Sequence, residues 1–168
     1  MGIMKAAAVR GLIPAGNKVT ELRSDLFRLM YEMAEVLEKK YGREGLETAA
    51  EVFARLGAQD GELMKSRLGL GDTLHDALDA WVIVGNIMGA KIKTRWVSDT
   101  RVETEHPYCP QHAVFVERGK IYCEHVCLPY VNTLAKTICP ALEPEVVRAA
   151  DMDHTCVKAL MLPEEKAE

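Results

Sequence analysis

The sequence predicts an α+β fold, in which an N-terminal helical layer packs on a small antiparallel sheet of two hairpins with one helix between them. Before Gly89, apolar residues recur every three or four positions, which is typical of helices. After Gly89, they alternate with polar residues, which is typical of half-buried strands. Helical and extended segments are therefore segregated along the chain, and this favours α+β over an alternating βαβ order.

The composition predicts one domain. The chain has 168 residues, of which 48% are hydrophobic and 27% charged, enough for a substantial core. We expect the domain to span residues 17–162, between a loose N-terminus (1–16) and a solvated tail (163–168). The net charge of −4 argues against nucleic-acid or anionic-membrane partners. An odd number of cysteines without a secretory leader predicts a reducing compartment, the cytoplasm.

The first expected helix begins at Asn17 or Thr20 and ends before Gly42. Its apolar residues recur at helical spacing, so they are expected to form one continuous face against the core. That face consists of Val19, Leu22, Leu26, Leu29, Met30, Met33, Val36 and Leu37.

Three more helices are expected before Gly89. A helix over residues 44–56 should end at Gly57, since glycine commonly terminates helices, and a shorter one follows with a stop at Gly69. The last spans residues 74–88, with Asp72 or Thr73 as its N-cap.

Two hairpins and one helix complete the predicted fold. Residues 91–96 and 101–106 alternate around a turn, and the alternation places Val102, Thr104 and His106 on the inward face. Residues 145–150 and 156–161 form the second hairpin, with a turn at 151–155 whose acidic residues are explained by turn chemistry. Between the hairpins, a helix should begin near Leu128 or Pro129.

A cysteine- and histidine-rich stretch over residues 106–139 is the candidate functional site. It holds four of the five cysteines and three of the five histidines of the chain. Cys109 and His112 form a C-x2-H pair, and Cys123 and Cys127 a C-x3-C pair. Thiolate and imidazole are the ligands that zinc and iron–sulfur clusters select, so either cofactor is expected here. The alternative is that these cysteines are small buried hydrophobic residues, and a role for Cys139 is left open.

Cys127 also has a reactive setting. It precedes the expected helix, where unpaired amides and the helix dipole favour a thiolate over a thiol. This thiol is therefore a candidate metal ligand or nucleophile. His106 is a second candidate because it should point inward, although a buried histidine that is satisfied by a backbone carbonyl explains it equally well.

The order of these elements resembles that of a known group. Together with the runs at residues 42–50 (Gly-Arg-Glu-Gly-Leu-Glu-Thr-Ala-Ala) and 56–61 (Leu-Gly-Ala-Gln-Asp-Gly), residues 20–162 are similar to the aminothiazoline-carboxylate hydrolase-like proteins and the related four-vinyl-reductase domains, which bind small molecules. In related sensor domains, one zinc ligand precedes the last long helix and two flank the final hairpin. The resemblance implies Cys123 or Cys127 and Cys156 as ligands, while residues 147–149 offer no middle one. Cys156 thereby joins His112 as a candidate fourth ligand beside Cys109, Cys123 and Cys127.

Two functions follow from the resemblance. As an enzyme, the protein would hydrolyse a carbon–nitrogen bond in a small cyclic substrate, with Glu124, His125 or His106 relaying a proton from metal-bound water, or with Cys127 as nucleophile. As a non-catalytic sensor module, it would hold a hydrophobic small molecule between the helical layer and the sheet, beside a structural metal site. A small-molecule ligand or substrate is the expected partner, and a homodimer is left open.

Overall fold

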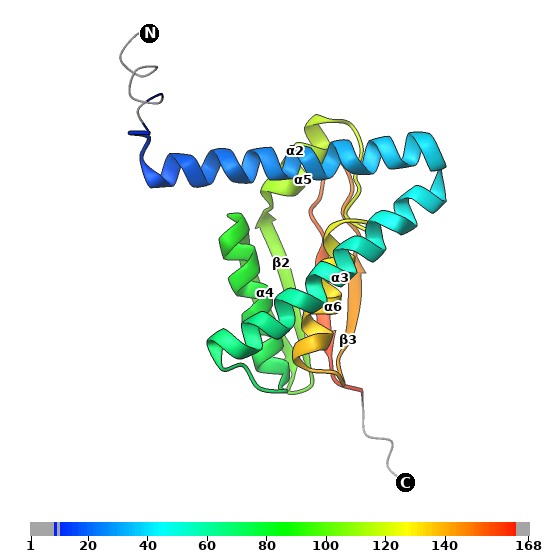
Figure 1. Cartoon of the computed structure of the whole chain (residues 1–168). Coiled ribbons are helices and arrows are strands. Elements are labelled where there is room, and N and C mark those ends of the chain that lie inside the picture. The colour runs from blue at the N-terminus through cyan, green and yellow to red at the C-terminus, as the bar shows by residue number, and fades with distance from the viewer. Residues whose placement is uncertain (1–8, 10, 164–168) are drawn as a thin grey trace.

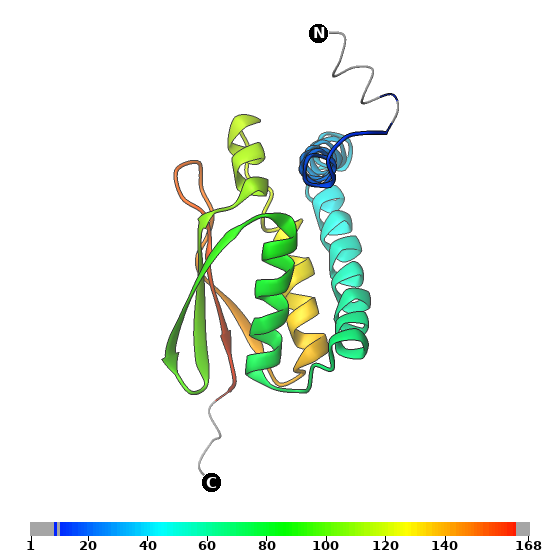
Figure 2. The same cartoon turned by 90° about the vertical axis from the view of Figure 1, so that its left-hand side faces the viewer.

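The described part of the computed structural model, residue 9 and residues 11–163, has the predicted α+β fold. A layer of helices covers one face of a four-stranded antiparallel sheet of order β1-β2-β4-β3 (Figures 1 and 2). Among these residues, no helix is long and apolar enough to cross a membrane. The expected loose N-terminus and solvated tail lie mostly outside the described residues. The elements are α2 (Ala15–Tyr41), α3 (Arg43–Leu68), α4 (Leu74–Met88), β1 (Lys91–Ser98), β2 (Arg101–Tyr108), α5 (Pro110–Glu117), α6 (Cys127–Ile138), β3 (Glu143–Arg148) and β4 (Val157–Met161).

Both predicted hairpins are present, and they join through β2 and β4. The inward face of β2 is as predicted: Val102 is 0%, Thr104 1% and His106 9% exposed. Helices α4 and α6 lie against this face, and the Trp81 indole of α4 donates a hydrogen bond to the Val131 carbonyl of α6 (2.7 Å). Thr73 caps α4 by accepting from the Asp76 amide (3.1 Å), one of the two N-caps expected. The core between sheet and helices therefore follows from the sequence pattern.

The predicted break at Gly57 is wrong, because α3 continues as one helix to Leu68. A Cβ on Gly57 would lie 2.2 Å from the Tyr130 carbonyl oxygen, and one on Gly61 would lie 2.8 Å from the Thr137 Cβ. Both glycines thus allow the backbones of α3 and α6 to approach closely. Here glycine serves helix packing and does not end a helix.

The prediction of which residues of α2 face the core is also mostly wrong. The side chains that α2 buries are Phe27, Tyr31 and Ala34, whereas Leu22 is 68% and Leu29 64% exposed. The reason is helix α5, which the sequence pattern did not predict. Its Phe115 is fully buried and forms an aromatic cluster with Tyr31 and Tyr122, so α2 turns its aromatic face toward α5.

Around the cysteine-rich stretch, the chain is more helical than expected. Cys109 is the N-cap of α5 and Pro110 its first residue, so a helix follows directly on the first cysteine of the stretch. Helix α6 begins at Cys127, one residue earlier than the earlier of the two predicted starts. In the turn before β4, the Asp151 carboxylate accepts from the backbone amides of Asp153 (2.8 Å) and His154 (2.7 Å). That turn is therefore explained by Asx-type hydrogen bonding, as predicted.

Candidate functional site

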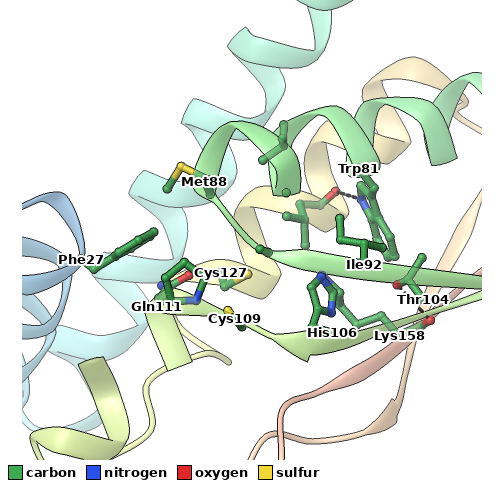
Figure 3. Close-up of a pocket in the computed structure, with 15 residues that line it drawn as sticks. Phe27, Trp81, Met88, Ile92, Thr104, His106, Cys109, Gln111, Cys127 and Lys158 are labelled. Atoms are coloured by element: carbon green, nitrogen blue, oxygen red, sulfur yellow. Dashed lines mark hydrogen bonds between the residues drawn. The ribbon is translucent and has the colours of Figure 1, made fainter. Parts of the chain in front are cut away.

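A small inner cavity of about 60 Å³ lies between the sheet and the helices. A water molecule occupies about 30 Å³ in the liquid, so the inner cavity has room for a polar head group. Figure 3 shows His106 and Lys158 toward the sheet, and Cys109, Gln111 and Cys127 toward the helical end. The remaining wall is mostly apolar and includes Phe27, Trp81, Val84, Met88, Ile92 and Val131.

A larger outer cavity of about 420 Å³ adjoins the inner one and is lined by side chains of α2, α3, α4 and α6 and by Gln111 of α5. Its volume falls within the usual range for small-molecule sites, roughly 300–1,000 Å³. Partly exposed leucines such as Leu56 and Leu63 line it, so it opens to solvent. The two cavities share wall residues, namely Val84, Met88, Gln111, Cys127 and Val131. The two cavities are therefore direct neighbours.

His106 brings an unpartnered polar atom to the inner cavity. Its Nδ1 is buried and has no hydrogen-bond partner within the described part of the chain. Burial, and then the positive charge of Lys158, lower the pKa of His106 to about 4, which outweighs a hydrogen bond to the backbone of Cys156. The imidazole is thus neutral at pH 7. A backbone group forms a hydrogen bond with only part of this side chain. The alternative interpretation, a buried histidine that is fully hydrogen-bonded to the backbone, therefore does not account for Nδ1.

Lys158 places a buried positive charge on the same wall. The residue is 3% exposed, and its Nζ lies 4.6 Å from the centre of the Trp81 ring. None of the ion pairs within the described part of the chain includes Lys158. The attraction of an ammonium group to an indole face offsets only part of the cost of its desolvation. The inner cavity therefore contains a cation without an anionic partner among the residues that the structure describes.

Four thiols gather in the same buried region. Burial is the main cause that raises the pKa of Cys109 and Cys123, and of Cys127 to about 12. In addition, the negative charge that Cys156 would carry raises the pKa of each of the other three. The dipole of α6 therefore does not make Cys127 a thiolate at pH 7, contrary to the expectation from its position. Cys139 lies at the opposite end of α6, in the core, and is not part of this region.

The other predicted site residues lie elsewhere. His112, on α5, hydrogen-bonds through Nε2 with the Asp151 carbonyl (2.7 Å). Glu124 is exposed, and His125 lies near Glu38 of α2. None of these three lines the inner or the outer cavity. Of the proposed catalytic residues, the structure brings together Cys127 and His106.

The thiols suit a zinc ion or an iron–sulfur cluster in their chemistry but not in their arrangement. Thiolates are good ligands for both. Within residues 11–163, however, no three His, Cys, Asp or Glu side chains are placed so that they could hold one ion. The metal site stays a prediction, with Cys109, Cys123, Cys127 and Cys156 as its candidate ligands.

Lys158 and Gln111 are the residues of the site that sequence reasoning missed. A signal for Lys158 was present, because strand alternation places it on the same face as Cys156 and Leu160. Gln111 had no such signal, since helix α5 itself was not predicted.

No protein-family model matches this sequence, and no curated protein matches it. The described residues form an α+β fold with an inner cavity between sheet and helices and an outer cavity among the helices. The similarity to the hydrolase-like and four-vinyl-reductase groups stays a prediction, and the function is argued from the cavity itself.

Proposed function

We propose that this protein binds a small, mainly apolar molecule in the outer cavity. The observation that carries the proposal is the cavity of about 420 Å³, which has a mostly apolar lining with Asp60 and Gln111 in it and shares walls with an inner cavity that contains His106 and Lys158. Binding sites of small molecules commonly combine apolar walls with a few polar groups that fix orientation. The proposal corresponds to the sensor-module alternative and places the ligand among the helices, with its end directed toward the sheet.

The state of Cys127 supports binding over catalysis. Because burial raises its pKa to about 12, the side chain is a thiol at pH 7, and a thiol is a weak nucleophile. Glu124 and His125, two of the proposed proton relays, lie away from the cavities. All five cysteines are free, which suits the reducing cytoplasm that we infer for this protein.

Filling the cavity should abolish binding. Leu56 lines the outer cavity, and Leu56→Trp would place an indole in the space that the ligand needs. In the wild type, a small aromatic ligand at about 100 times its Kd should stabilise the fold by about 2.7 kcal/mol, or raise the melting temperature by roughly 5–10 °C. Leu56→Trp should show no such rise in a thermal-shift assay.

Val52→Trp is the matched control. Val52 lies one turn earlier on α3, is 50% exposed and lines neither cavity, so its replacement should leave the thermal shift intact. The proposal fails if no small aromatic or alkyl ligand stabilises the wild type. It also fails if Leu56→Trp is stabilised as strongly as the wild type.

A thiolate-bound zinc ion or iron–sulfur cluster is a second candidate, which rests on the ligand chemistry of the thiols and not on their arrangement. Protein purified without oxygen is then expected to contain metal in stoichiometric amount, and Cys127→Ala to lose it. Elemental analysis measures the metal, and a visible spectrum distinguishes colourless zinc from a coloured cluster. Cys139→Ala, at the far end of α6, should retain the metal.

The same preparations test the hydrolase hypothesis. Hydrolysis of aminothiazoline carboxylate or a related cyclic amidine by the wild type, but not by Cys127→Ala, would replace the binding module with an enzyme. Metal-free wild type would leave Cys109, Cys123, Cys127 and Cys156 as buried hydrophobic residues.

A further inference from the structure

We propose that the ligand carries an anionic head group, a carboxylate, that enters the inner cavity and pairs with Lys158. The inference rests on the proposed function and specifies its ligand class: an amphipathic acid with an aromatic or alkyl tail. It starts from the ammonium group of Lys158, which has no anionic partner among the residues that the structure describes.

A lysine in this position would be costly without such a partner. Moving an ammonium group from water into a protein interior costs several kcal/mol unless an anion and hydrogen bonds compensate. Lys158 is 3% exposed, and its nearest compensation is the face of Trp81 at 4.6 Å. Methionine or leucine would fill the same space without a charge. The ammonium group of Lys158 is explained if it binds an anionic group of the ligand.

The cavity geometry fits a carboxylate followed by an apolar tail. The inner cavity of about 60 Å³ has Lys158 on its wall, and the neutral imidazole of His106 beside it adds no negative charge. The outer cavity of about 420 Å³ continues past Cys127 and Gln111, which both cavities share. The head would then lie against the sheet, where Figure 3 shows Lys158, and the tail among the helices that line the outer cavity.

The neighbouring thiols are the competing source of negative charge. Cys109 and Cys127 line the same cavity, and they would offset the charge of Lys158 only as thiolates, for example as ligands of a metal ion. If thiolates on a metal were the partners of Lys158, a ligand carboxylate would have no advantage over a neutral group. Comparison of a charged with an uncharged ligand therefore shows whether thiolates or the ligand's carboxylate neutralise Lys158.

The test compares 4-phenylbutyrate with 4-phenylbutyramide, which has nearly the same shape but no charge, by titration calorimetry at pH 7.5. The wild type should bind the carboxylate at least about tenfold more tightly than the amide, since a desolvated charge pair contributes 1.4 kcal/mol or more. Lys158→Met should lose this preference while it still binds the amide. Lys158→Arg should keep it, and so should Lys93→Met, a control on the exposed part of β1.

Ligand-free stability gives an independent readout. Because Lys158→Met removes an uncompensated buried charge, its melting temperature should equal or exceed that of the wild type. A substantially lower melting temperature would overturn the inference, since it would show that the charge already has a partner in the protein.

Equal binding of the two compounds by the wild type would overturn the carboxylate inference and leave the apolar binding function standing. Retention of the wild-type preference by Lys158→Met would do the same. If neither compound bound and no other small apolar ligand did, both proposals would fail.

Discussion

Gly57→Ala is expected to destabilise the protein by about 3 kcal/mol, because a methyl group at this position has no room. Its Cβ would lie 2.2 Å from the carbonyl oxygen of Tyr130, which is backbone and cannot rotate away. Helices α3 and α6 would have to separate, and both contribute to the outer cavity. Urea denaturation followed by circular dichroism measures the loss, and ligand binding should weaken with it.

Gly16→Ala is the control for Gly57→Ala. Gly16 lies in α2 with open space around its Cβ position, so alanine there should leave stability equal or slightly higher. Equal stability of Gly57→Ala and the wild type would contradict the close approach of the two helices.

Phe115→Ala should cost about 3–5 kcal/mol of unfolding free energy, the usual range for deletion of a fully buried phenylalanine side chain. Phe115 is 0% exposed, and its ring centre lies 5.8 Å from that of Tyr31 and 6.1 Å from that of Tyr122. The cluster fixes α5 against α2, and α5 supplies Gln111 to both cavities. Thermal and chemical denaturation measure the loss.

Phe115→Leu keeps most of the buried volume, so it should lose much less stability than Phe115→Ala. If both variants were as stable as the wild type, Phe115 would not be the anchor of α5. The orientation of α2 would then need another explanation.

The elements that the sequence predicts well are those whose pattern reflects local burial. Strand β2 alternates because one face is in the core and the other is not, and α4 has a threonine N-cap and a glycine after its end. Gly57 and the face of α2 could not be predicted in this way. Both depend on which helix lies opposite, α6 and α5 respectively, and periodicity carries no such information.

The residue types of the candidate site could be predicted from the sequence better than their arrangement in space. Cysteine spacing singled out Cys109 and Cys127, and strand alternation singled out His106, all of which line the inner cavity. His112 was predicted as a metal ligand beside Cys109, whereas the structure directs its side chain to the Asp151 carbonyl. Lys158 was overlooked because a lysine in a strand is usually solvated, and only the tertiary structure shows that it is buried.

Methionine methyl NMR tests the ligand-binding claim most directly. Met30, Met64 and Met88 line the outer cavity, whereas Met152 lies 45% exposed in the turn before β4. Titration of methyl-labelled protein with 4-phenylbutyrate should shift the resonances of Met30, Met64 and Met88, saturate at one ligand per chain and leave Met152 unchanged. Unchanged resonances of the three cavity methionines at saturating ligand would contradict the account.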